Sequence, residues 1–172
     1  MKSNSKIREM TFIALFVAII SIVSQIAIPM PSTVPMTIQL LVIVFFGYFL
    51  GVRQGMIGIF LYIAIGAVGA PVFAGFRGGF YVLLGPTGGF IWGFILVVLL
   101  CAIAAKTRLA IVVGMISIML CHFIGVIQFS FVAGIDMWVS FVAVSLPYII
   151  KDIAFVPLAY LLYKKMSRLI KI

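Results

Sequence analysis

Long apolar runs alternate with short breaks along the whole chain. The runs cover residues 10–28, 37–50, 55–70, 87–105, 109–133 and 138–163. A helix needs about 20 mostly apolar residues to cross the hydrocarbon core of a bilayer, and fewer where protein shields it. We therefore predict an all-α integral membrane protein. It forms a single domain over residues 1–172, a bundle of six transmembrane helices with both termini on one side.

Each break between these runs combines helix-stopping residues with polarity. The breaks are residues 29–35, Gly51 with Arg53, residues 71–86, Lys106 with Arg108, and Gly134 with Asp136. The first holds three prolines, and the third is long and rich in glycine. Irregular backbone persists at membrane depth only where protein or a water-filled cavity shelters it. We therefore expect these two segments to lie as irregular external loops over a ligand pocket.

Composition and charge also indicate a lipid environment. Hydrophobic residues make up 66% of the chain and charged residues only 9%, whereas about a quarter of a soluble domain is charged. The formal net charge of +9 does not indicate a nucleic-acid partner, because the cations share no water-exposed face with interleaved aromatics. Ten of them fall on one side of the predicted bundle: Lys2, Lys6, Arg8, Arg53, Lys106, Arg108, Lys164, Lys165, Arg168 and Lys171. The positive-inside rule then makes both termini cytoplasmic.

Asp152 is the most informative polar residue, since it lies within the last apolar run. An unpaired ionisable group there would cost several kcal/mol, so we expect a functional role. Two alternatives stay open: an internal ion pair with Lys151, or a hydrogen bond that only holds helices together. Lys151 either faces the cavity or extends toward a membrane interface. His122 and Gln39, also inside apolar runs, either bond to other helices or contact a ligand.

The glycine-rich break carries further candidates for ligand contact. Arg77 would either bind a carboxylate through its guanidinium or anchor the loop at the lipid head groups. The aromatic residues Phe73 and Tyr81 either face lipid or the core, or stack on a ligand ring.

Gly85, Pro86 and Thr87, with two more glycines after them, begin the fourth run. The stretch lacks the lysine of a phosphate-binding loop, so we expect no ATP binding by that route. Its glycines either permit a tight entry into the fourth helix or let a ligand approach the backbone.

Ala14 and Ala18 lie one above the other on the first predicted helix, where small side chains let another helix approach closely. That helix belongs either to the same bundle or to a partner protein. Cys101 and Cys121 lie in apolar runs without the spacing of metal ligands, which favours packing residues over a zinc site or a disulfide. With three acidic residues and one histidine in the chain, we expect no catalytic site, metal or cofactor.

Four stretches together suggest a known family. They are Pro35-x-Thr37-x-Gln39, residues 66–73, the Gly-Pro-Thr-Gly-Gly block at 85–89, and Pro147 followed by Asp152. In these stretches the sequence resembles the BioY family, the biotin-specific substrate-binding components of energy-coupling-factor transporters. The resemblance runs from the first predicted helix to the sixth. It implies a six-helix protein of the prokaryotic cell membrane that binds biotin near the outer face. It also implies association with a transmembrane coupling subunit and two cytoplasmic ATPases.

The resemblance further implies roles for single residues. In the family an Asp, followed three residues later by a Lys, contacts the ureido ring of biotin. Asp152 matches the Asp, while Phe155 stands at the Lys position. Lys151 lies one turn earlier on the same helical face and is the substitute that the sequence offers. In the family the stripe that matches Ala14 and Ala18 docks onto the coupling subunit. From its chemistry, the carboxylate of biotin needs a donor such as Arg77, and the sequence leaves open which residue meets it.

Three alternatives to a biotin-binding subunit remain at this stage. The chain could be a related subunit for another vitamin, an intramembrane enzyme, or a small channel. An enzyme would need convergent titratable groups, which are scarce here. A channel would need a polar stripe along several helices, and the apolar runs carry none.

Overall fold

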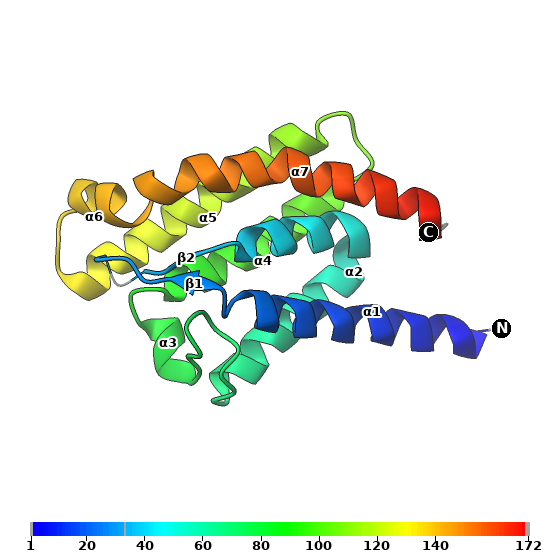
Figure 1. Cartoon of the computed structure of the whole chain (residues 1–172), viewed down its shortest axis with the longest axis horizontal. Helices are drawn as coiled ribbons and strands as arrows, with labels where there is room; N and C mark the ends of the chain where they lie inside the picture. The colour runs from blue at the N-terminus through cyan, green and yellow to red at the C-terminus, as the bar shows by residue number, and fades with distance from the viewer. Residues whose placement is uncertain (1, 33, 171–172) are drawn as a thin grey trace.

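The chain folds almost entirely into helices, as the apolar runs predict (Figure 1). The structure is a computed structural model that describes residues 2–32 and 34–170. The elements of this part are α1 (Lys2–Val23), β1 (Ala27–Ile28), β2 (Met36–Thr37), α2 (Gln39–Ala67), α3 (Phe80–Leu84), α4 (Gly88–Ala104), α5 (Ala110–Ala133), α6 (Met137–Val144) and α7 (Leu146–Ile170). The predicted all-α fold class is confirmed.

The second and third predicted runs form one element, α2, which bends sharply at Gly51. The backbone there has φ 72° and ψ 175°, a conformation that glycine adopts without steric cost. Figure 1 shows the two halves of α2 pointing in different directions, with the bend at the end of the molecule that holds both termini. The break predicted at Gly51 is therefore a turn between two helical passes.

The last predicted run, residues 138–163, is two helices and not one. Asp136 caps α6, because its side chain accepts a hydrogen bond of 2.7 Å from the backbone amide of Trp138. At Ser145 the backbone leaves helical geometry, with φ −124° and ψ −52°. Pro147 lacks an N–H and so cannot extend the hydrogen bonds of α6, but it suits the first turn of α7. The sequence prediction of one helix was therefore wrong here: it followed the continuous hydrophobicity and did not use Pro147 as a boundary.

The helices run between two ends of the molecule, and the N- and C-termini lie at the same end (Figure 1). The bend of α2 and the turn between α4 and α5 lie at that end too. At the opposite end lie the β1–β2 hairpin, the loop that follows α2, and the short helices α3 and α6. In the hairpin, Ala27 pairs with Thr37 and Ile28 pairs with Met36. This arrangement agrees with the six predicted passes and with termini on one side.

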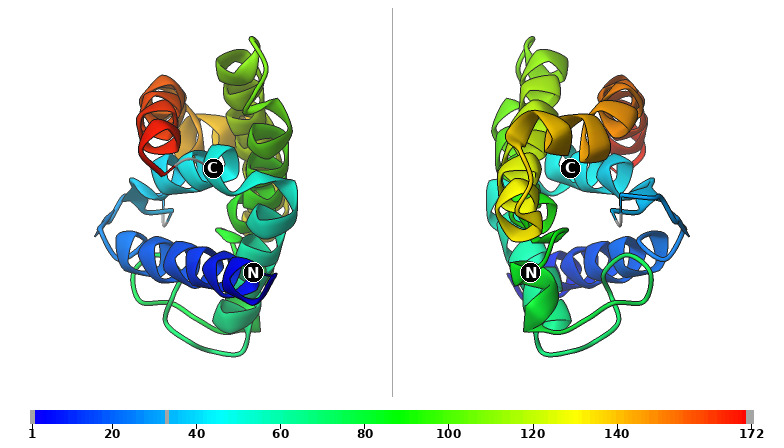
Figure 2. Two further views of the ribbon diagram at one scale, coloured as in Figure 1. Left: turned by 90° about the vertical axis from the view of Figure 1, so that its right-hand side faces the viewer. Right: turned by 90° about the vertical axis from the view of Figure 1, so that its left-hand side faces the viewer.

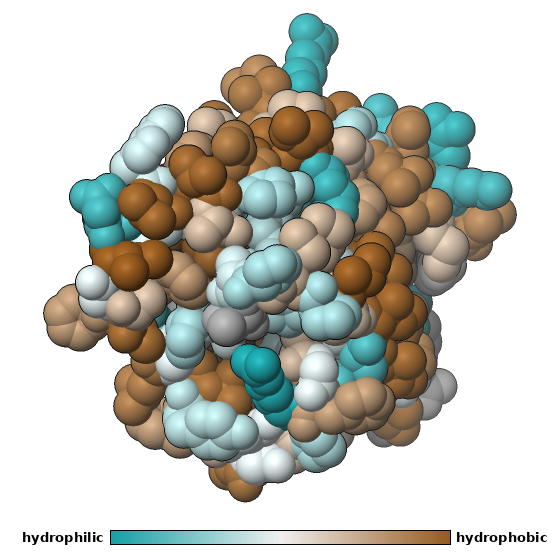
Figure 3. Space-filling model, turned by 60° about the vertical axis from the view of Figure 1, so that its left-hand side comes forward, coloured by the Kyte–Doolittle hydropathy of each residue, from teal (hydrophilic) through white to brown (hydrophobic). Residues whose placement is uncertain are grey.

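Charge is distributed unevenly between the two ends. Arg53 follows the bend of α2, Lys106 and Arg108 lie in the turn before α5, and Lys164, Lys165 and Arg168 lie near the end of α7. Lys171, which the sequence analysis grouped with them, lies outside the described residues. At the opposite end the loops carry Arg77 and Asp136, and hydrophilic side chains, from pale to dark teal, lie there among hydrophobic brown ones (Figure 3).

The centre of the bundle is α4, which packs between α2 and α5 (Figure 2). Glycines allow these helices to approach closely. A Cβ at Gly47 of α2 would lie 2.9 Å from Cys101 Cβ, and one at Gly93 of α4 would lie 2.7 Å from Cys121 Sγ. Both cysteines are fully buried and unbonded to one another. They are small packing residues opposite glycines, as the sequence suggests.

α1 packs chiefly against α2 and presents one face to it. Phe16 is fully buried against Gly58, where a Cβ would lie 2.4 Å from the Phe16 ring. The rings of Phe12 and Phe49 meet edge to face at 5.5 Å. Ala14 and Ala18 lie on another face of α1 and are exposed. The stripe of small residues is therefore not used for packing within this chain.

The outer surface of the bundle is suited to lipid. Among the described residues, three helices are long and apolar enough to cross a membrane, namely α2, α5 and α7 over Leu146–Leu169, and α4 is a shorter apolar helix. Large apolar side chains face outward along them, among them Phe123 at 61% exposure and Phe131 at 89%. In water such a surface would be an aggregation site, whereas in a bilayer it needs no cover.

The separation of charge between the two ends leads to a prediction of topology. Single cysteines at Ser32 and Arg77 should react with an impermeant maleimide added to intact cells. Those at Lys106 and Lys164 should react only after permeabilisation, because the cationic end is retained inside. The native residues Cys101 and Cys121 should not react with the maleimide, because both are 0% exposed. Labelling of Lys106→Cys from outside would contradict the proposed orientation.

Candidate functional site

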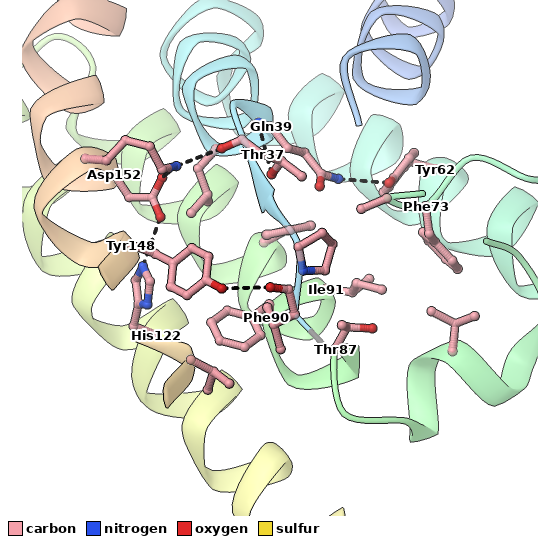
Figure 4. Close-up of a pocket in the computed structure, with 18 residues that line it drawn as sticks. Thr37, Gln39, Tyr62, Phe73, Thr87, Phe90, Ile91, His122, Tyr148 and Asp152 are labelled. Carbon is pink, nitrogen blue, oxygen red and sulfur yellow. Dashed lines mark hydrogen bonds and ion pairs between the residues drawn. The ribbon is translucent and has the colours of Figure 1, made fainter. Parts of the chain in front are cut away.

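A cavity lies inside the bundle, toward the end that carries the hairpin and the irregular loops. Its apolar wall consists of Val34, Pro35, Leu40, Phe73, Ala74, Val82, Phe90, Ile91, Phe94 and Val144. Its polar lining consists of Thr37, Gln39, Tyr62, Thr87, His122, Tyr148, Lys151 and Asp152. Most of these side chains are labelled in Figure 4. Segments from both halves of α2, from α4, α5 and α7, and from the two irregular loops therefore meet at one cavity.

Asp152 contributes a carboxylate to this cavity from the second turn of α7. The residue is only 3% exposed. Its Oδ1 pairs with the Lys151 ammonium, and its Oδ2 lies 3.2 Å from Nε2 of His122 on α5. A buried carboxylate that lacked such partners would carry the full cost of desolvation. The ion pair that was one alternative for Asp152 is therefore present, and it lies at the wall of a cavity.

Lys151 connects α7 to the loop that enters α2. Its Nζ donates a hydrogen bond of 2.7 Å to the backbone oxygen of Thr37. The same ammonium lies 4.8 Å from the centre of the Phe155 ring, within the range of a cation–π contact. The ammonium thus lies over the residue at the family's lysine position. Of the two alternatives for Lys151, the structure has the one that faces the cavity.

A second polar network forms the opposite part of the wall. Gln39 Nε2 donates to the hydroxyl of Tyr62 at 2.9 Å, and that hydroxyl donates to the backbone oxygen of Val72 at 3.0 Å. Ser24 Oγ donates to the same oxygen at 2.6 Å. The network therefore ties both halves of α2 and the end of α1 to the loop that carries Phe73. Phe73 in turn packs its ring edge to face on Tyr62, at 5.5 Å.

Tyr148 closes the cavity beside the hairpin loop. Its hydroxyl donates a hydrogen bond of 2.7 Å to the backbone oxygen of Val34, and it lies 3.2 Å from Ser32 Oγ. In the part of the chain that the structure describes, every buried side-chain nitrogen and oxygen has a hydrogen-bond partner. A ligand would consequently share or replace existing hydrogen bonds when it enters.

Six of the predicted contact residues line the cavity, and four do not. Those in the wall are Gln39, Phe73, Thr87, His122, Lys151 and Asp152. Arg77 is exposed on the loop, where its backbone pairs with that of Phe73. Tyr81 is 70% exposed on the outer side of α3. Gly85 and Pro86 lie in the turn between α3 and α4, outside the wall.

The glycine block around this turn serves close packing. Gln128 of α5 donates its amide to the backbone oxygens of Leu83 and Gly85, at 2.8 and 2.9 Å. A Cβ at Gly88 would lie 1.9 Å from the Leu83 oxygen, so no larger residue fits there. These glycines therefore permit a tight entry into the fourth helix, which was one of the two alternatives predicted for them. Of residues 85–87, Thr87 alone lines the cavity.

Tyr62 and Tyr148 line the cavity, but neither was predicted from the sequence to be part of the site. A tyrosine in an apolar run looks the same whether it faces lipid or a cavity. Helical spacing from Asp152 could have found Tyr148, because the two residues are four apart in α7 and so share one face of the helix.

The site has the chemistry of a binding pocket for a polar ring with an apolar body. A carboxylate and an ammonium lie side by side, and apolar side chains surround them. Among the described residues, no group of three or more His, Cys, Asp or Glu side chains could hold a metal ion. The arrangement offers acceptors for N–H donors, a donor for a carbonyl oxygen, and apolar contact for the rest of a ligand.

Comparison with known proteins agrees with this description. The model of the BioY family matches residues 1–172. The probable biotin transporter BioY of Pyrococcus horikoshii is 32% identical over 148 residues, which are 86% of this chain and 89% of that protein. The biotin transporter BioY2 of Lactococcus lactis subsp. cremoris is 36% identical over 138 residues, which are 77% of this chain and 75% of that protein.

A solved structure has the same fold. It is a crystal structure of the S-component for biotin from an ECF-type ABC transporter, with a TM-score of 0.88 and 25% sequence identity. The match covers 98% of this chain and 95% of that chain. The resemblance found in the sequence is thus confirmed: the chain is a multi-pass membrane protein that belongs to the BioY family.

Proposed function

We propose that this chain is the biotin-binding subunit of an energy-coupling-factor importer, and that it captures biotin in the cavity beside Asp152. The observation that carries this proposal is the buried carboxylate of α7, paired with Lys151 and His122 at the wall of an otherwise mostly apolar cavity. The family and the solved S-component with the same fold support the choice of ligand.

The two chemical parts of the cavity suit the two parts of biotin. The ureido ring has N–H donors and a carbonyl oxygen, and the cavity offers the Asp152 carboxylate as acceptor and the Lys151 ammonium as donor. The fused ring and the valeryl chain need apolar walls, which Phe73, Phe90 and Ile91 supply. Thr87 adds a hydroxyl on the α4 side of the cavity.

The carboxylate at the end of biotin's valeryl chain needs a hydrogen-bond donor beyond the apolar part of the cavity. Arg77 lies on the loop whose residues Phe73 and Ala74 line the cavity, and its side chain is exposed. We assign it to the biotin carboxylate at the mouth of the cavity, where a guanidinium can bind a carboxylate through two N–H groups. Tyr81, Gly85 and Pro86, the other predicted contacts, lie outside the cavity wall and have no part in this proposal.

Transport requires energy that this chain does not supply by a phosphate-binding loop. We assign ATP hydrolysis to two cytoplasmic ATPase subunits, and docking to a transmembrane coupling subunit. The protein would lie in the plasma membrane of a prokaryote, with its cationic end in the cytoplasm and the hairpin end outside. Biotin would then enter from the end shown in Figure 3.

Asp152→Asn tests the ligand assignment. The substitution keeps the size of the side chain but removes its charge, so biotin binding should weaken by about 1.5–3 kcal/mol, the typical range for a hydrogen bond to a charged group. Isothermal titration calorimetry of the purified protein measures this change. Asp136→Asn is the matched control, because Asp136 caps α6 away from the cavity wall and its loss should leave biotin affinity unchanged. Equal affinity of wild type and Asp152→Asn would remove Asp152 from the binding site.

Ala14→Trp and Ala18→Trp test docking onto the coupling subunit. Both alanines are exposed on α1, so a larger side chain should leave the fold and biotin binding intact while it holds a partner helix away. Co-purification with the coupling subunit and ATP-driven uptake should be lost. Leu161→Trp is the control, since Leu161 is 64% exposed but lies on α7 and not on the stripe of α1. Aggregation or loss of biotin binding in the alanine variants would instead indicate packing within the bundle.

A further inference from the structure

His122 uses both of its ring nitrogens within the protein. The residue is only 3% exposed. Nε2 lies 3.2 Å from Asp152 Oδ2, and Nδ1 lies 3.0 Å from the hydroxyl oxygen of Ser145. The ring of Phe90 packs edge to face on the imidazole at 5.6 Å and holds its plane. Figure 4 shows His122 pointing from α5 toward Asp152.

The chemistry of the two partners assigns the proton positions of a neutral imidazole. A carboxylate only accepts hydrogen bonds, so Nε2 must carry the proton that it donates to Asp152. Nδ1 is then an acceptor, and the Ser145 hydroxyl donates to it. The hydroxyl thereby fixes the tautomer in which the imidazole supports the carboxylate, a role that a hydrogen bond at the other ring nitrogen commonly has.

Ser145 reaches His122 because α6 ends there. It is fully buried, and its backbone amide still bonds to the Phe141 oxygen at 3.0 Å. Its own backbone oxygen accepts from the amides of Tyr148 and Ile149, at 3.0 and 2.9 Å, so α7 starts at the same residue. The break between α6 and α7 therefore has a structural consequence that the hydrophobicity of the sequence does not show. It places a hydroxyl against a histidine on a neighbouring helix.

His122 and Ser145 also lie at a second, apolar hollow on the outer side of α5. That hollow is lined by side chains of α5, α6 and α7, among them Met119, Phe123 and Trp138. His122 therefore lines both the cavity beside Asp152 and this apolar hollow. Apolar surroundings with a low dielectric strengthen the hydrogen bond between His122 and Asp152 and favour a single geometry.

We propose that His122, with its tautomer fixed by Ser145, is a positioning residue that orients the Asp152 carboxylate toward the ureido N–H groups of biotin. Lys151 takes one carboxylate oxygen and His122 takes the other, which fixes the plane of the carboxylate. Each oxygen keeps a lone pair for a ligand donor. His122 itself needs no contact with biotin. This inference rests on the proposed function, because it assumes that Asp152 binds the ureido ring.

Four variants test the proposal by biotin titration in detergent. His122→Leu removes the donor, and Ser145→Ala removes only the hydroxyl that fixes the tautomer. His122→Leu should weaken biotin binding about tenfold, the lower end of the effect of a hydrogen bond to a charged group, and Ser145→Ala should weaken it less, about threefold, because its hydroxyl bonds to a neutral ring. His122→Gln keeps an N–H donor of similar reach and should recover most of the affinity. Ser140→Ala is the matched control, because Ser140 is equally buried but bonds only to the Asp136 backbone oxygen, at 2.9 Å.

A double-mutant cycle separates positioning from a general effect on the fold. If His122 acts through the carboxylate, His122→Leu should change the dissociation constant less than about twofold in an Asp152→Asn background. Additive losses, or no loss in either His122→Leu or Ser145→Ala, would overturn the proposal. If His122→Leu does not fold, Ser145→Ala gives the same cycle with a smaller change. Failure of the proposed function is distinguishable, because then Asp152→Asn itself would leave biotin affinity unchanged.

Discussion

Asp152 adds a carboxylate to α7, a helix whose other side chains mostly contact lipid or protein. The rest of the site depends on how this negative charge is compensated. Within a membrane-spanning helix an unpaired acid costs up to about 2.5–3.5 kcal/mol, even on the most permissive scale. Here Lys151 neutralises the charge and His122 adds a hydrogen bond. Each Asp152 oxygen still has a lone pair that can accept a hydrogen bond from a ligand in the cavity. The paired carboxylate is therefore stable in the bundle and also able to recognise a ligand.

The fold brings the partners of this carboxylate from distant parts of the sequence. His122 comes from α5, and the hydroxyl that supports it comes from the break between α6 and α7. Lys151 fastens α7 to the Thr37 oxygen at the entry to α2. Close contacts between α2, α4 and α5 at glycines such as Gly47 and Gly93 hold these helices in register. The irregular loops can then lie over the cavity without leaving their polar backbone unpaired in lipid.

Much of this architecture follows from the sequence, because membrane solvation restricts the chain so strongly. Apolar runs predict the helical passes, and Gly51 predicts the turn between the two halves of α2. The division at Ser145 was not predicted, because hydrophobicity continues across it and Pro147 is the one sequence signal that marks it. Asp152, Lys151 and His122 stood out because charged and ionisable residues are rare in such runs. Tyr62 and Tyr148 did not, because their direction is set by tertiary packing. Arg77 and Tyr81 have suitable chemistry for a ligand, but the loop and α3 leave them exposed outside the inner cavity.

The central claim is that the cavity beside Asp152 is a specific site for biotin. Its most direct test is mass spectrometry of the small molecules released when the wild-type protein, purified from cells grown with a mixture of vitamins, is denatured. We expect biotin in near-equimolar amount and no other vitamin above the level of a detergent-only control. Release of a different vitamin, or a protein that releases none and fails to bind added biotin, would contradict the account.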